Sequence, residues 1–248
     1  MRKLARRLPI LATRTKGPST PNFRKFYELL ESGAQTSIAF DRDRISDQHG
    51  GVGIAMAFVV DLLEQIEGLS KHDARAVVDG QNVYINQEIF FLLIRTVDVY
   101  AIELYSILDY LAVELAEIFR LEYERCGEKK EVEYFFELLK VKSLPFGLKA
   151  IVQALIKEPW FTYFHDLRGR VTHRAPVHFV GLGRRDENGD FINFRYPFLP
   201  DNPKEITLTF SQRLDVLDES KKWLGGIFDF VERVCGTLLT LFQTSPPS

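Results

Sequence analysis

The sequence has few of the residues that build a disulfide framework, a zinc site or a membrane-spanning segment. Its 248 residues include only two cysteines, Cys126 and Cys235, at no spacing typical of a metal site or a redox pair. No run reaches the roughly 18 uninterrupted apolar residues that a transmembrane helix needs. The net charge of -2 gives no overall bias toward nucleic acid, so any anion-binding surface must be local. We therefore expect a cytoplasmic protein that makes no contact with a membrane.

The sequence also lacks the motifs of metal-dependent and nucleotide-hydrolysing enzymes. Its acidic residues show no paired arrangement resembling a two-metal nuclease. There is no Gly-rich phosphate loop. We expect neither a metal nor a cofactor.

Apolar residues, in contrast, recur at helical spacing through most of the chain. The hydrophobic content of 46% is enough to bury a core of ordinary size. The longest periodic run covers 88–125 and contains neither Gly nor Pro, which predicts a very long helix. Other helices are predicted at 22–32, 54–66, 128–142, 146–156, from Pro159 to just before Pro176, and at 212–242 after an N-cap at Ser211.

Short extended segments replace this pattern between residues 177 and 210. The turn-forming sequence at 187–190 predicts a β-hairpin, and 205–210 resembles a further strand. The expected fold class is mainly α: a helical bundle with a long helical hairpin and a small β-hairpin insertion before the C-terminal helix. We expect an N-terminal extension of short helices at 1–87, the bundle at 88–243 with its insertion at 177–210, and a tail at 244–248.

The first 16 residues are basic and contain no acidic residue. This composition is compatible with an organelle transit peptide or with an arm that touches phosphate. The apolar run is too short and interrupted for a secretory signal. We favour the simpler interpretation, a solvated basic tail.

One segment could carry chemistry: Arg168 is followed five residues later by His173. Leu167 precedes the arginine, aromatic residues occupy the buried face of the predicted helix, and Pro176 stops it. This segment resembles the Arg-x-x-x-x-His signature of the HEPN superfamily. In that family the motif lies on a helix that follows a long helical hairpin and precedes a C-terminal helix, and the predicted elements have the same order.

Such a pair of side chains can act on a phosphodiester of RNA. An imidazole titrates near neutrality, so His173 could remove the proton of the 2′-hydroxyl or protonate the leaving 5′-oxygen. The guanidinium of Arg168 could contact the non-bridging oxygens and stabilise the transition-state charge.

The resemblance implies an RNA endonuclease that needs no metal and leaves 2′,3′-cyclic phosphate ends, acting as a toxin or defence effector. It implies a homodimer as well, because two motif-bearing helices often face each other in the family and form a composite site with two Arg and two His. A cognate inhibitor protein would be a further partner. Two alternatives stay open: a non-catalytic module that binds RNA, a nucleotide or a protein, and a structural protein whose Arg168 and His173 satisfy buried carboxylates.

Neighbours of the motif are candidates for substrate binding, each with a structural alternative. His165 could contact the substrate or bond to a nearby carboxylate, and Thr172 could bind a phosphate or cap its own turn. Arg174 could bind RNA or stabilise the negative end of the helix dipole. Gly169 departs from the family, which commonly has a polar residue at this position. The glycine either allows another helix to approach closely or marks a degraded site.

Basic residues of the predicted hairpin form a second candidate group. Arg184 and Arg185, with Arg195, could line a rim that follows the phosphates, with Phe191 and other aromatic residues as stacking surfaces. The alternative is a hairpin that is basic for solubility and edge protection. Next to the motif we expect Arg170 to pair with Asp166 four residues earlier.

A second Arg-x-x-x-x-His match runs from Arg44 to His49. It lies in a polar segment that continues into Gly50 and Gly51. We predict no helix there, and interpret this match as a coincidence.

Overall fold

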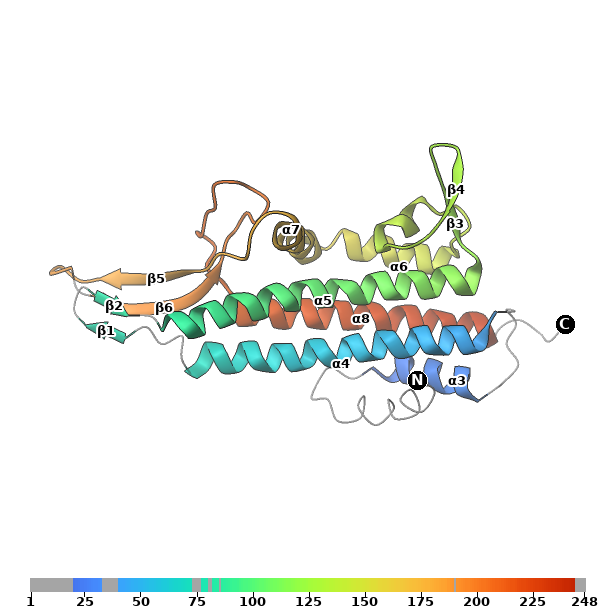
Figure 1. Ribbon diagram of the computed structural model, residues 1–248, viewed down its shortest axis with the longest axis horizontal. Coiled ribbons are helices and arrows are strands. Elements are labelled where there is room, and N and C mark those ends of the chain that lie inside the picture. Colours follow the sequence, from blue (N-terminus) through green and yellow to red (C-terminus); the bar gives the residue numbers. More distant parts are fainter. Residues whose placement is uncertain are drawn as a thin grey trace. The chain divides into compact units, whose positions relative to one another are not determined.

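The chain folds into a mainly helical protein, which confirms the predicted class. The computed structural model describes residues 20–32, 40–72, 77–79, 82–84, 86–189 and 191–243. The basic segment 1–16 and the tail 244–248, both singled out above, lie outside these residues. The helices of the described part are α3 (Pro21–Glu31), α4 (Arg42–His72), α5 (Gln87–Phe119), the 3-10 helix η1 (Phe135–Lys140), α6 (Phe146–Ile156), α7 (Pro159–His173) and α8 (Val216–Gln243) (Figure 1).

Short antiparallel strands connect the helices. Strands β1 (Val77–Asp79) and β2 (Asn82–Tyr84) pair with each other, as do β3 (Glu122–Arg125) and β4 (Glu128–Glu131). A third sheet has the order β5 (Val180–Arg185), β6 (Phe191–Leu199) and β7 (Leu214–Asp215). The predicted β-hairpin before the last helix corresponds to β5 and β6, with Val180 opposite Phe198.

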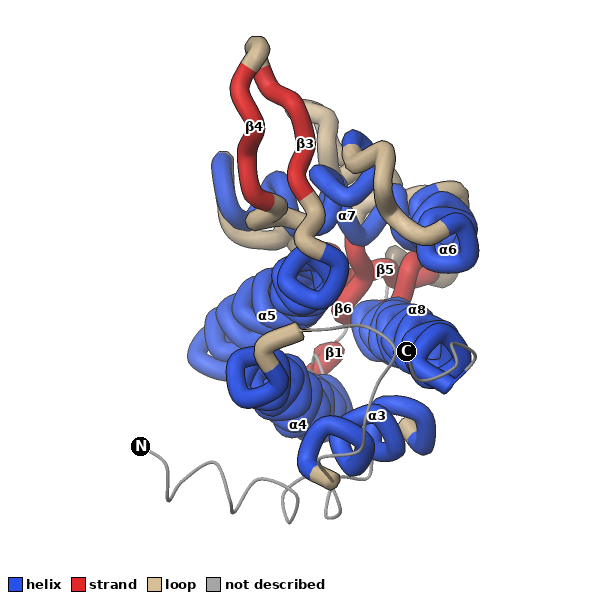
Figure 2. Tube along the Cα trace, turned by 90° about the vertical axis from the view of Figure 1, so that its right-hand side faces the viewer, coloured by secondary structure: helices blue, strands red, loops and turns tan. Residues whose placement is uncertain are grey.

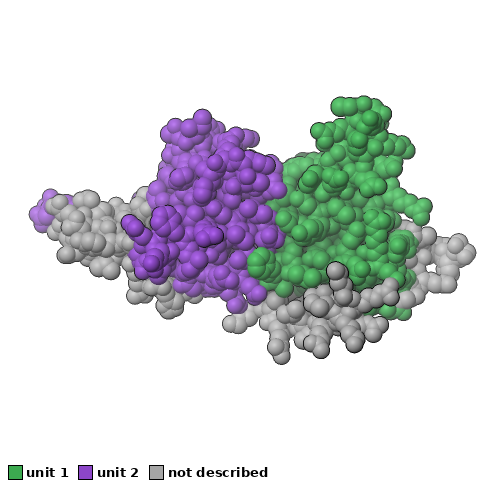
Figure 3. Space-filling view, in the orientation of Figure 1, with its two compact units in different colours: residues 1–58, 104–158, 225–248 green, residues 59–103, 159–224 purple. Residues whose placement is uncertain are grey.

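The chain divides into two compact units, coloured separately in Figure 3. Unit 1 comprises residues 1–58, 104–158 and 225–248, and unit 2 comprises 59–103 and 159–224. The predicted division of the chain at residue 87, where α5 begins, stays a prediction.

In unit 1, parts of the three long helices α4, α5 and α8 lie side by side, and α3 lies against α4 and α8 (Figures 1 and 2). Aromatic rings fill the space between the helices. Phe135 of η1 meets Phe230 of α8 edge to face at 5.6 Å, and Phe26 of α3 lies 5.6 Å from Phe242 of α8. Such pairs add to the large apolar area that each ring buries.

In unit 2, α5, α7 and α8 surround a core centred on Trp223, which is fully buried. The ring of Phe164 lies 5.3 Å from that of Trp223. The hydroxyl of Tyr100 on α5 donates to the carbonyl of Ser220 on α8 at 2.7 Å, and burial raises the pKa of this tyrosine. This hydrogen bond satisfies the hydroxyl inside the apolar core.

The predicted helix at 54–66 is wrong in extent, because α4 begins at Arg42 and has 31 residues. The polar stretch that was expected to be irregular has a buried face: Ile45, His49 and Val52 are fully buried at helical spacing. Burial of this face outweighs the roughly 1 kcal/mol that each glycine costs inside a helix. Gly50 and Gly51 therefore lie within α4.

The chain after α5 was also predicted wrongly. We expected helix to residue 125 and again over 128–142, but α5 ends at Phe119 and a β-hairpin follows. Cys126 and Gly127 form its two-residue turn with φ of 54° and 81°, a left-handed geometry that reverses the chain. The hydroxyl of Tyr123 on β3 is hydrogen-bonded to the carboxylate of Glu137, which ties the hairpin to η1.

Two further predictions near the C-terminal helix are wrong. Residues 205–210 form an irregular loop rather than a strand. The last helix begins at Val216 instead of residue 212, because the carboxylate of Asp215 accepts the backbone N–H groups of Leu217 and Asp218 at 2.9 and 3.1 Å. Asp215 is thus the N-cap that we had assigned to Ser211.

Within the described ranges, no helix combines the length and apolarity required to cross a bilayer.

Candidate functional site

Helix α7, which carries the Arg168–His173 motif, is anchored in unit 2 by its aromatic face. Pro159 occupies its first turn, where a missing N–H costs nothing. Phe161, Phe164 and Leu167 are buried at helical spacing. The hydroxyl of Tyr163 donates to the carbonyl of Pro200 at 2.7 Å, and burial raises the pKa of this phenol. The helix is therefore held on one side, and its last turn reaches the surface.

The two motif residues differ in exposure. His173, the last residue of α7, is exposed, whereas Arg168 is half-buried. Residues five apart on a helix are separated by about 140° around its axis. Arg168 and His173 therefore do not share one stripe of α7, and only the length of the arginine side chain lets both groups reach one pocket.

The side chains of His165 and Thr172, which were candidates for substrate binding, make contacts within the protein instead. His165 Nδ1 lies 3.6 Å from the carboxylate of Asp166. The hydroxyl of Thr172 donates to the carbonyl of Arg168 at 2.9 Å and so closes its own turn. Among the described residues, a Cβ on Gly169 would meet nothing within 4 Å, so no close approach within this part of the chain requires the glycine.

Arg170 and Arg174 hold a loop in place. The guanidinium of Arg170 donates to the carbonyls of Pro203 and Glu205 at 3.3 and 3.1 Å, and that of Arg174 donates to the carbonyl of Lys204 at 2.7 Å. The predicted pair between Arg170 and Asp166 is wrong. The Lys204 ammonium lies 3.7 Å from the Asp166 carboxylate instead.

The positions 166, 170 and 174 are four residues apart and form one stripe along α7. Carbonyl oxygens accept hydrogen bonds but carry no net charge, so both guanidinium groups keep their positive charge next to the motif. The last two turns of α7 and the residue that follows them thus carry three arginines, at 168, 170 and 174, against one carboxylate, Asp166.

The loop that this stripe grips is stabilised from within by Asp201 and Asn202. The Asp201 carboxylate accepts the backbone N–H and the hydroxyl of Ser211 at 2.6 and 2.7 Å, and the backbone N–H of Gln212 at 2.9 Å. Asn202 accepts the N–H of Thr209 at 2.7 Å. We did not predict this loop, although the Asp-Asn-Pro sequence at 201–203 is a turn signal.

For the basic residues of the β5–β6 hairpin, we describe only the positions of the backbone in the strand pairing. Arg184 lies opposite Asn193 and Arg185 opposite Phe191 in the β5–β6 pairing, while Arg195 lies opposite Leu182. A phosphate-following rim at these positions stays a prediction.

The second motif match, from Arg44 to His49, does lie on a helix, so the reason for dismissing it was wrong. His49 of α4 is fully buried, with Nδ1 at 2.9 Å from the carboxylate of Glu114, which is also fully buried. The guanidinium of Arg44 pairs with Glu117 at 3.1 Å. Both side chains hold α4 against α5, and the buried imidazole cannot reach a substrate.

No group of three or more His, Cys, Asp or Glu residues that could bind a metal occurs in the part of the chain that the structure describes. Comparison of the chain with protein-family models, curated proteins and solved structures gave no match.

Proposed function

We propose that this protein is a HEPN-like RNA endonuclease that cleaves without a metal and leaves 2′,3′-cyclic phosphate ends. The observation that carries the proposal is the contrast between the two Arg-x-x-x-x-His segments. The imidazole of His49 is buried against a carboxylate, whereas that of His173 is exposed at the end of a helix whose last turns carry more arginines than acidic residues. The order of helices supports the proposal in part: α7 follows the long helix α5 and precedes the long C-terminal helix α8, although the predicted second helix at 128–142 does not form.

In the proposed reaction, His173 takes the proton of the 2′-hydroxyl. The 2′-oxygen attacks phosphorus, and the 5′-oxygen leaves after receiving a proton from a second imidazole. Arg168 contacts the non-bridging oxygens, where charge accumulates in the transition state. A homodimer supplies the second imidazole, because each chain has a single His in this motif and one imidazole does not easily serve as both base and acid in one displacement.

The wider setting belongs to the same proposal. The protein would act on cytoplasmic RNA as a toxin or defence effector, and a cognate inhibitor protein would restrain it. The arginines at 184, 185 and 195 would extend the phosphate-binding surface beyond α7.

A non-catalytic RNA-binding module is the second candidate, and two observations favour it. Arg168 is half-buried, and Gly169 replaces the polar residue expected beside it. Such a protein would retain the arginines of α7 and bind RNA without cutting it.

The test is an RNA cleavage assay with purified protein in EDTA. We expect products with 2′,3′-cyclic phosphate and 5′-hydroxyl ends, and a loss of rate of about a hundredfold or more in His173→Ala and Arg168→Ala. His178→Ala is a matched control, because His178 is an exposed histidine of the same unit outside the motif. RNA that is bound but never cut would favour the non-catalytic module, and a wild-type protein that does neither would exclude both candidates.

A further inference from the structure

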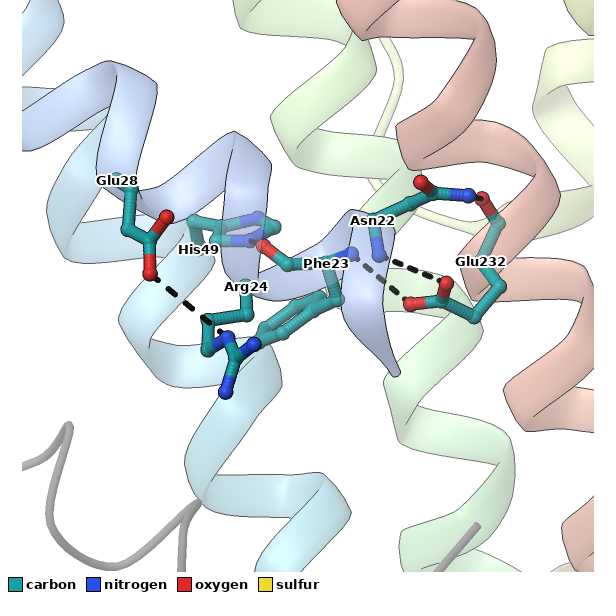
Figure 4. A network of polar contacts seen from close by, with 6 residues as sticks. All are labelled: Asn22, Phe23, Arg24, Glu28, His49 and Glu232. Atoms are coloured by element: carbon teal, nitrogen blue, oxygen red, sulfur yellow. Dashed lines mark hydrogen bonds and ion pairs between the residues drawn. The ribbon is translucent and has the colours of Figure 1, made fainter. Parts of the chain in front are cut away.

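In unit 1, both backbone polar groups of Phe23 in helix α3 bond to side chains of other helices (Figure 4). Its backbone N–H donates to the carboxylate of Glu232 on α8 at 2.9 Å, next to that of Asn22 at 2.8 Å. The residue before the helix, Thr20, gives no side-chain cap. Glu232 therefore supplies from another helix the acceptor that the first turn of α3 needs.

The carbonyl of Phe23 is bound by His49 of α4. Nε2 of His49 lies 3.1 Å from this oxygen, and the ring of Phe23 stacks on the imidazole at 3.9 Å. On its other side, Nδ1 of His49 faces both carboxylate oxygens of Glu114 at 2.9 and 3.1 Å. His49 thus connects α3 to α5 through the interior.

These contacts fix the number of protons in the site. A carbonyl oxygen only accepts, so Nε2 of His49 must carry a hydrogen. Nδ1 then faces a carboxylate, and a second proton must lie either on Nδ1 or on Glu114. His49 and Glu114 hold this additional proton together, in a site where both side chains are fully buried.

We propose that α3 is a latch that is closed by the proton shared between His49 and Glu114. Loss of that proton leaves the carboxylate of Glu114 facing a nitrogen lone pair in the interior, an arrangement that is strongly unfavourable. Undocking of α3 relieves it, because Phe23, through its carbonyl and its ring, and Phe26 cover the imidazole on that side, and their departure admits water to Nε2. The latch therefore opens as the pH rises.

The neighbouring Cys235 and Tyr27 do not titrate in place of the His49–Glu114 pair. Burial, and then the charges of Glu114 and Glu232, raise the pKa of the Cys235 thiol on α8 well above its ordinary value. Burial, with Glu31 and Asp47 nearby, raises the pKa of Tyr27, whose ring lies 6.1 Å from that of His49. Both groups stay neutral across the range in which an imidazole titrates. Glu232 serves α3 as a carboxylate cap, and Arg44 and Glu117 form an outer ion pair.

The latch is tested by amide hydrogen exchange at several pH values, with protection factors corrected for the intrinsic rate. From about pH 6 to about pH 9 the protection of α3 should fall roughly tenfold or more, while that of the central α8 amides stays constant. Nitrogen NMR of labelled histidine should show that this loss follows the proton of His49. Unchanged protection of α3, or a loss shared equally by α8, would overturn the proposal.

Two variants distinguish the effect of the shared proton on the docking of α3 from the effect of the Glu232 cap. In Glu114→Gln the side-chain amide can donate to Nδ1 of a neutral His49, so α3 should stay docked and its protection should no longer depend on pH. In Glu232→Gln the cap is weakened at every pH, but the dependence should remain. If Glu114→Gln does not fold, the wild-type exchange and NMR data still decide, and a pH dependence that survives in a folded Glu114→Gln protein contradicts the latch.

Discussion

The same six-residue pattern occurs twice on helices of this protein, at the start of α4 and at the end of α7, with different outcomes. The α4 pattern faces α5, which places Glu114 against His49 and Glu117 against Arg44. The α7 pattern leaves its imidazole exposed and its arginine half-buried. Spacing therefore does not define a site; the residues on the facing helix decide whether an Arg–His pair supports the fold or remains accessible for chemistry.

The largest predicted difference between the two patterns is in stability. His49→Ala leaves the buried carboxylate of Glu114 without its partner and should lower the free energy of unfolding by about 3–5 kcal/mol. His173→Ala should change it by less than about 0.5 kcal/mol, because the side chain is exposed. Denaturant unfolding of both variants measures the difference, and similar values would break the comparison. His49→Leu combined with Glu114→Met should recover much of the loss, since no buried charge remains.

The loop gripped by α7 gives the next largest effect. Burial would raise the pKa of Asp201, but hydrogen bonds from Ser211, Gln212 and Thr209 outweigh it and lower the pKa from its ordinary value. A carboxyl group with a lowered pKa in the folded state stabilises the loop fully above its unfolded pKa of about 3.9, and this stability is lost as the pH falls through the folded value.

Asp201→Ala should therefore weaken the loop by about 1–2 kcal/mol at neutral pH. Hydrogen exchange at the amides of Ser211 and Gln212 measures this weakening. In the wild-type protein the same amides should lose protection on acidification below about pH 4, whereas in Asp201→Asn the acid step should disappear. An acid step of equal size in both proteins would show that another group controls the loop.

The sequence predicted well what depends on local patterns. The apolar period located α3, α6 and α7 closely, and Pro159 marked the start of α7. It failed where distant residues decide: the face that contains Ile45, His49 and Val52 is buried in the folded protein, where His49 contacts Glu114 of α5 and Phe23 of α3. In the same way, residues 205–210 alternate like a strand, yet Asp201 and α7 hold them as a loop.

For the site, the sequence predicted which residues to inspect but not their surroundings. The acidic partners of His49 and Arg44 are more than 60 positions away in the chain, so no local pattern could reveal them. Likewise, nothing near Arg170 and Arg174 indicates that their guanidinium groups hold the carbonyls of residues 203–205.

The smallest predicted effect compares two glycines, each directly after a motif residue. In the part of the chain that the structure describes, a Cβ would meet nothing within 4 Å at either Gly50, which follows His49, or Gly169, which follows Arg168. Both lie inside helices, so Gly50→Ala and Gly169→Ala should each raise the free energy of unfolding by roughly 0.5–1 kcal/mol. Gly236→Ala is the control, because its Cβ would lie 3.0 Å from Nδ2 of Asn22 and should cancel the gain.

RNA binding and cleavage assays of Gly50→Ala and Gly169→Ala provide a second comparison of the two patterns. If Gly169→Ala weakens RNA binding or cleavage while Gly50→Ala does not, the surface beside Arg168 approaches another molecule closely, as a composite site in a homodimer requires. Equal behaviour of both variants in stability and in RNA assays would show that the glycine of α7 has no such role. The exposed His173 would then be the remaining support for a site on this helix.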